Sequence, residues 1–196
     1  MSRANILAAL TKNQPEQVPL PSLTMDREEI TDLREKFKAM AEGIGSKVIE
    51  VNATSEIPAW LVQEFPSAKR VVTLVEELVS PTVSAFALTG PHDFENVDVA
   101  IFKPALAVAE NSALWLTEDL MGVRVLPFIT QHIVMLVDVS TLVPDMHAAY
   151  QILGDANYGY GAFISGPSKT ADIEQSLVLG AHGPRSMTVF MYDKTD

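Results

Sequence analysis

The sequence contains no cysteine among its 196 residues. This excludes disulfide bonds, a thiol nucleophile, a zinc–thiolate site and an iron–sulfur cluster held by this chain. Cations are also scarce, since 14 Lys and Arg stand against 25 Asp and Glu, which gives a formal net charge of −11. Nucleic acids and anionic membrane surfaces are bound by clustered Lys and Arg, so the composition argues against both as partners.

Long apolar runs are missing as well. The most apolar stretch, residues 123–143, is interrupted by Arg124, Pro127 and Asp138, whereas a membrane span needs about 20 mostly apolar residues. The apolar start of the chain turns polar at residues 11–14, which is too early for the core of a signal peptide. We therefore expect a soluble, cytoplasmic protein with no membrane insertion.

The spacing of apolar residues predicts an α/β domain. Helices are expected at 2–12, 26–42, 56–65 and 145–153, and strands at 47–51, 70–74, 97–102, 106–109, 113–117, 132–139, 161–165 and 187–192. Runs such as 133–137 are apolar on both faces, which is typical of a central strand in a covered, largely parallel sheet. We predict an open, mostly parallel, three-layer α/β sandwich at 26–196, preceded by a helix and an extended arm at 1–25.

The densest group of polar side chains surrounds two Gly-Pro turns between residues 161 and 185. The first turn follows a predicted strand, and we expect a short helix beyond it with Ser168 or Thr170 at its N-cap. Hydroxyls, a cation and free amides at the carboxyl end of a strand would suit a carboxylate or a phosphate. The ligand-binding candidates are Ser165, Ser168, Lys169, Thr170, Asp172 and Arg185. In the alternative, the turns only shape the chain and the acids pair with Arg185.

Glu110 is a second candidate, at a turn formed by Asn111 and Ser112 between two predicted strands. A carboxylate that leaves a sheet interior would be partly desolvated, with a raised pKa, and could act as a base or a nucleophile. The alternative is a hairpin in which the Glu and Asn side chains bind backbone amides of the turn.

The four histidines show no metal-binding spacing, so no metal site is predicted. His182, between the two glycines of the second turn, is the candidate for proton transfer together with Glu110. His132 opens a buried strand, where its side chain could reach a cleft or remain a residue of the core edge. Dinucleotide-binding, phosphate-loop and Gly-x-Ser-x-Gly motifs are absent from the sequence.

The motifs around the two turns resemble a known family. Residues 164–174, Ile-Ser-Gly-Pro-Ser-Lys-Thr-Ala-Asp-Ile-Glu, and residues 177–185, Leu-Val-Leu-Gly-Ala-His-Gly-Pro-Arg, are similar to the C-terminal signature of the LUD-domain family. This group includes lactate utilization protein C. Residues 98–115 and 124–134 agree more loosely with the family pattern, so the resemblance covers nearly the whole chain.

The resemblance implies a fold similar to that of sugar-phosphate isomerases and coenzyme A transferases. It also implies a role in the oxidation of L-lactate, or of a related 2-hydroxy or 2-oxo acid, beside iron–sulfur partner proteins. Because this chain has no cysteine, clusters would lie only in those partners, and no cofactor is expected here. A small anionic metabolite would then bind in a cleft, with Lys169 or Arg185 at its charge and His182 or Glu110 moving a proton.

One departure from the family pattern suggests other functions. Where many relatives have Glu-Thr-Gly-Thr, this chain has Glu-Asn-Ser-Ala at 110–113, which is similar to the Ser-Glu-Asn-Gly turn of coenzyme A transferases. Acyl or coenzyme A transfer through Glu110 is therefore one alternative, with backbone amides holding the oxyanion. A non-catalytic accessory subunit of an iron–sulfur lactate-oxidising complex is another. The apolar N-terminal arm, with Ile6, Leu7 and Leu10, could pack across a homodimer.

Overall fold

The computed structural model describes residues 2–16, 18–19, 32–85, 91–173 and 176–193. The first helix, α1 (Arg3–Lys12), begins as expected after Ser2, whose hydroxyl accepts a hydrogen bond from the backbone N–H of Asn5. It buries no residue, and its apolar side chains Ile6, Leu7 and Leu10 are each about half exposed. Packing of this arm across a homodimer therefore stays a prediction.

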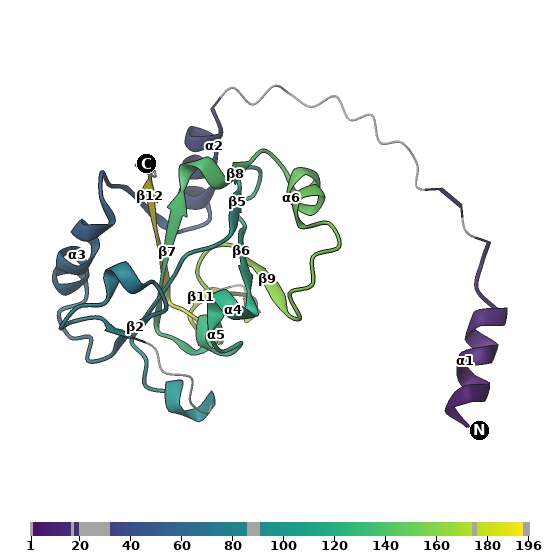
Figure 1. The fold of residues 1–196 in the computed structure, drawn as a ribbon. Coiled ribbons are helices and arrows are strands. Elements are labelled where there is room, and N and C mark those ends of the chain that lie inside the picture. Colours follow the sequence, from purple (N-terminus) through teal and green to yellow (C-terminus); the bar gives the residue numbers. More distant parts are fainter. Residues whose placement is uncertain (1, 17, 20–31, 86–90, 174–175, 194–196) are drawn as a thin grey trace.

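A six-stranded parallel sheet forms the centre of the fold (Figure 1). In spatial order its strands are β1 (Lys47–Glu50), β12 (Ser186–Tyr192), β7 (His132–Asp138), β4 (Val99–Phe102), β2 (Val71–Thr73) and β3 (Ser84–Ala85). Every neighbouring pair is parallel. The long strands β7 and β12 are buried from their second residue onward, because both of their faces are covered. The predicted mostly parallel α/β sheet is confirmed.

The two faces of this sheet are covered differently. On one face lie α3 (Ile57–Glu64) and the 3-10 helix η2 (Glu76–Leu78), which pack through Ile57, Leu61 and Leu78. On the other face α2 (Leu33–Gly43) lies beside a second sheet. That sheet has the order β8 (Leu142–Val143), β5 (Leu106–Val108), β6 (Leu114–Thr117) and β9 (Gly161–Ile164). Its outer surface is covered by α6 (Met146–Leu153).

Helix α2 begins later than the sequence predicts. Its N-cap is Asp32, whose carboxylate accepts a hydrogen bond of 3.1 Å from the backbone N–H of Glu35. The expected first turn at 26–31 lies outside the described residues. The shorter elements are η1 (Thr54–Glu56), η3 (Pro91–Phe94), α4 (Glu118–Met121), α5 (Leu126–Ile129) and η4 (Val139–Thr141). In the described ranges, no helix has the length and apolar character needed to cross a membrane.

The predicted short helix after residue 168 is wrong. The chain instead forms an antiparallel hairpin of β10 (Lys169–Ile173) and β11 (Ser176–Leu179), in which Thr170 pairs with Val178. β-Branched residues at 170, 173 and 178 favour the extended backbone and outweigh the capping signals. Thr170 therefore caps no helix, and Asp172 lies in a strand.

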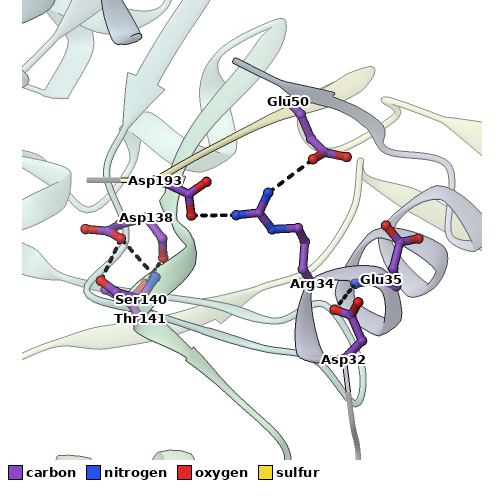
Figure 2. A network of polar contacts seen from close by, with 8 residues as sticks. All are labelled: Asp32, Arg34, Glu35, Glu50, Asp138, Ser140, Thr141 and Asp193. Atoms are coloured by element: carbon purple, nitrogen blue, oxygen red, sulfur yellow. Dashed lines mark hydrogen bonds and ion pairs between the residues drawn. The ribbon is translucent and has the colours of Figure 1, made fainter. Parts of the chain in front are cut away.

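Figure 2 shows polar contacts at the carboxyl ends of three strands of the central sheet. Arg34 of α2 pairs with Glu50, the last residue of β1, at 3.4 Å, and with Asp193, directly after β12, at 2.5 Å. Asp138, the last residue of β7, accepts hydrogen bonds from the backbone N–H and the hydroxyl of Ser140. These contacts tie α2 to this edge of the sheet and mark where the strands end.

Candidate functional site

A cleft of about 770 Å³ lies at the amino-terminal edge of the central sheet. We call it the amino-edge cleft. Six of its polar side chains come from residues at or just before the starts of β2, β4, β7 and β12, namely Lys69, Arg70, Asp98, Gln131, His132 and Arg185. Ser67, Glu95 and Asn96 also line the cleft. His132 and Arg185, both candidates from the sequence, therefore line the same cleft. The general rule for parallel sheets predicted a site at the opposite, carboxyl edge.

His132 is held in a fixed orientation in this cleft. Its Nδ1 lies 2.8 Å from the hydroxyl oxygen of Ser186, and its ring packs against Phe65 with the centroids 4.6 Å apart. Burial lowers the pKa of His132 below its ordinary value, and the charge of Arg185 acts in the same direction against a smaller opposing effect of Asp98. The imidazole is therefore neutral near pH 7 and can donate or accept a proton.

The cations that border the amino-edge cleft differ in whether their side chains already have partners within the protein. The Arg70 guanidinium donates to the carbonyl of Asp93 and the amide oxygen of Asn96, and it lies above the ring of Phe94. It is therefore committed to the local structure. The side chains of Lys69 and Arg185 form no ion pair with any residue whose side chain the structure describes, a set that does not include Asp172. These two cations are the ones available to an anionic ligand.

Asp98 shapes the floor of the amino-edge cleft. One of its carboxylate oxygens accepts hydrogen bonds from the backbone N–H groups of Lys69, at 2.7 Å, and Arg70, at 3.0 Å. These bonds hold the backbone of the turn that leads into β2 in place. Asp98 keeps its negative charge, and Glu95 adds a second carboxylate to the cleft, so an anionic ligand must bind on the side of Lys69 and Arg185.

The two Gly-Pro turns form a smaller cleft of about 310 Å³ next to the first one. Four sequence candidates line it: Ser165, Ser168, Lys169 and His182. The turns are joined by a hydrogen bond from the backbone N–H of Ser168 to the carbonyl of Pro184, at 2.9 Å. Since Arg185 follows directly and lines the amino-edge cleft, the two clefts lie on either side of the segment 184–185.

The turn that contains Glu110 contacts the first Gly-Pro turn through Asn111 and Ser112, the residues that follow Glu110. The hydroxyls of Ser112 and Ser165 each donate to the carbonyl oxygen of Asn111, both at 2.8 Å. Ser112 adopts the left-handed backbone conformation, with φ of 53°. The loop after β9 and the turn after β5, which were separate candidates in the sequence, are therefore in direct contact.

The Glu110 side chain itself points elsewhere. It is exposed, and its carboxylate accepts a hydrogen bond of 3.1 Å from the backbone N–H of Met146, the first residue of α6. The expected partial desolvation is therefore wrong. The alternative of a hairpin is confirmed for the backbone and for Asn111, because β5 and β6 are antiparallel and the Ala113 N–H donates to the Asn111 side chain. It is wrong for Glu110, which binds an amide of α6 and not one of the turn. Whether Glu110 is a nucleophile stays a prediction.

Several lining residues were not predicted from the sequence. Lys69, Arg70, Asp98 and Gln131 lie at or next to the starts of the strands predicted at 70–74, 97–102 and 132–139, and that position is the signal that would have placed them at one edge. Of the candidates predicted from the sequence whose side chains are described, Glu110 and Thr170 line neither cleft. In the part of the chain that the structure describes, no three His, Asp or Glu side chains are placed to hold a metal ion.

The fold and its site define the class of protein. It is an α/β protein with a parallel central sheet, a second sheet on one face and a polar cleft at the amino-terminal edge. The family model of the LUD domain matches residues 91–192, which is more than half of the chain. The chain therefore belongs to the LUD-domain family.

Individual relatives agree with this assignment. Lactate utilization protein C from Oceanobacillus iheyensis is 33% identical over 105 residues, which are 50% of this chain and 45% of that protein. The protein of the same name from Shouchella clausii is 26% identical over 168 residues, which cover 83% of this chain and 73% of the relative. The first alignment thus spans less than half of the relative's length.

A solved structure shares the fold. The crystal structure of a DUF162 family protein from Deinococcus radiodurans superimposes with a TM-score of 0.62. The match covers 82% of this chain and 96% of the other, at 17% sequence identity. At this level of identity the likeness concerns the fold alone.

Proposed function

We propose that this protein takes part in lactate utilization and binds a small carboxylate, a 2-hydroxy or 2-oxo acid, in the amino-edge cleft. The names of the relatives support the first part of the proposal. The second part is supported by one arrangement, in which Arg185 and a neutral His132 line the same cleft. The cleft volume, about 770 Å³, falls within the range of small-molecule sites, roughly 300–1,000 Å³.

The two side chains suit the two ends of such a ligand. A guanidinium binds a carboxylate through two parallel hydrogen bonds, so Arg185 holds the acid group. His132 then faces the oxygen on the adjacent carbon, where a neutral imidazole can donate to a carbonyl or accept from a hydroxyl. Lys69 lines the same cleft and adds a second positive charge to it. These local cations attract an anion to a protein whose net charge is −11.

Isothermal titration calorimetry with L-lactate, pyruvate and lactamide tests the proposal. Lactamide keeps the hydroxyl of lactate but lacks its negative charge. We expect one or both acids to bind and lactamide to bind at least about tenfold more weakly, since a charge-assisted hydrogen bond contributes about 1.5–3 kcal/mol.

Two variants locate the site. Arg185→Gln should weaken binding of the acid by a similar factor. Arg3→Gln removes one positive charge from exposed α1 and should leave binding unchanged. Binding of lactamide as tight as that of the acids, or an equal effect of the two variants, would refute the proposed site.

A further inference from the structure

We propose that the crevice between the carboxyl ends of β2 and β4 is a second binding site, for a small zwitterion that carries an ammonium, a carboxylate and an apolar body. The crevice has a volume of about 480 Å³. It lies at the opposite edge of the central sheet from the amino-edge cleft, because it is lined by residues that follow β2 and by the end of β4. This inference does not depend on the proposed role in lactate utilization.

The topology of the sheet opens a crevice at this place. After β2 the chain passes to η2, whose Leu78 packs with α3 on one face of the sheet. After β4 the chain passes to β5, whose Ala107 packs on the opposite face. β2 and β4 are neighbours in the sheet. Adjacent parallel strands whose connections leave toward opposite faces form the switch point at which open α/β sheets bind ligands.

Lys103 supplies the positive charge of the crevice. Its Nζ lies 3.9 Å from the nearest carboxylate oxygen of Glu77 and 5.7 Å from the centroid of the Tyr192 ring. The Tyr192 hydroxyl has the largest effect on this amine and raises the pKa of Lys103. Lys103 is therefore an ammonium at neutral pH. At 3.9 Å its pairing with Glu77 is loose, so the charge is available to the carboxylate of a ligand.

Acidic side chains line the same crevice. Glu76 and Asp119 are exposed there, and neither forms an ion pair with another residue in the part of the chain that the structure describes. Together with Glu77, they outnumber Lys103, so they would repel a simple anion and attract an ammonium, while Lys103 attracts a carboxylate. In the described residues these acids do not form a group that could hold a metal ion. A ligand that carries an ammonium and a carboxylate can pair with the acidic side chains and with Lys103 at the same time.

The remaining walls are apolar and define the body of the ligand. Leu74, Phe102 and Leu120 line the crevice, and Leu74 is 38% exposed. An apolar group placed against them would leave water, which favours binding. A free α-amino acid with an apolar side chain combines all three features, namely the ammonium, the carboxylate and the apolar body.

Calorimetric titrations of the full chain with matched probes test this site. The zwitterions are L-leucine, L-methionine and L-phenylalanine. The single-charge analogues of leucine are 4-methylpentanoate, which lacks the ammonium, and 3-methylbutylamine, which lacks the carboxylate. We expect at least one amino acid to bind, and the two analogues of leucine to bind about tenfold more weakly than leucine, or not at all.

Variants place the binding in the crevice. Lys103→Gln and Asp119→Asn should each weaken amino-acid binding by about tenfold. Arg3→Gln, the charge-matched control on α1, should leave it unchanged. The proposal is overturned if none of the three amino acids binds, if either single-charge analogue binds as tightly as leucine, or if Lys103→Gln behaves like the control.

Discussion

The imidazole of His132 and the hydroxyl of Ser186 lie 2.8 Å apart where β7 and β12 begin side by side. The two residues are also partners in the parallel ladder, so the backbones of both strands fix their separation. Because Ser186 occupies Nδ1, the ring nitrogen left for a ligand is Nε2. The orientation of the imidazole in the amino-edge cleft is thus set by the central sheet and is independent of any ligand.

The lowered pKa of His132 predicts a pH dependence of stability. In the unfolded chain the imidazole has its ordinary pKa, about 6.5, so on acidification the unfolded state binds the proton before the folded state does. The free energy of unfolding should therefore fall as the pH drops below about 6.5, until the lower pKa of the folded state is reached. His132→Gln should flatten this part of the profile.

Urea unfolding followed by tryptophan fluorescence, at about pH 7.5 and about pH 5.5, measures the effect. Carboxylates titrate mostly below this window, so the difference between the wild-type and variant slopes isolates the histidine. Equal slopes for the two proteins would contradict the prediction.

We expect a substitution at Gly180, in the second Gly-Pro turn, to affect both stability and ligand binding. Its φ is +75°, and an added Cβ would lie 2.4 Å from Cγ of Arg185 and 3.0 Å from Cα of the same residue. Gly180→Ala should therefore lower the free energy of unfolding by about 1–3 kcal/mol, through backbone strain and the displacement of Arg185. The same variant should weaken carboxylate binding in the amino-edge cleft.

Gly43 provides the matched control for this substitution. It is the last residue of α2, and an added Cβ would have no atom within 4 Å. Gly43→Ala should raise the free energy of unfolding by about 0.5–1 kcal/mol and leave ligand affinity unchanged. Chemical denaturation and calorimetry of both variants make the comparison, and equal behaviour of the two would show that Arg185 is not constrained by Gly180.

We expect Glu110 to stabilise the start of α6, because it accepts a hydrogen bond from the Met146 N–H. Glu110→Ala removes the acceptor for the Met146 N–H and should lower the free energy of unfolding by about 1 kcal/mol. Glu110→Gln keeps an oxygen acceptor and should lower the free energy of unfolding by less than Glu110→Ala. Glu16→Ala, an exposed acid on the N-terminal arm, is the control in urea unfolding. If the Glu110→Ala and Glu16→Ala variants unfold alike, the hydrogen bond to α6 does not contribute.

The central sheet could be predicted from the sequence because its strands carry a direct signal. Runs such as 133–137 are apolar on both faces, and only a covered parallel sheet accommodates several of them. The second sheet could not be separated from the first, since β5 and β6 have only three and four residues. Strands this short do not show in their own residues which partner they pair with.

The candidate site was predicted in part. The polar turns around Ser168 and His182 do form one cleft, because glycine and proline at fixed positions constrain the chain locally. The sequence does not predict Lys69 and Asp98 as site residues, since their proximity to His132 comes from strand order, which depends on contacts between distant segments. The sequence predicts a helix after residue 168 where the structure has the hairpin of β10 and β11, because capping residues favour a helix and β-branched residues favour strands.

Strand β4 runs from the amino-edge cleft to the crevice at the carboxyl edge of the central sheet. Asp98, just before it, borders the amino-edge cleft, and Phe102, its last residue, borders the crevice at the opposite edge. At a rise of about 3.3 Å per residue, these positions are roughly 13 Å apart. Ligands at the two ends are therefore too far apart to touch. Strand β2 spans the same distance, since Arg70 before it borders the amino-edge cleft and Leu74 after it borders the crevice. Coupling between the two affinities would therefore act through these two neighbouring buried strands.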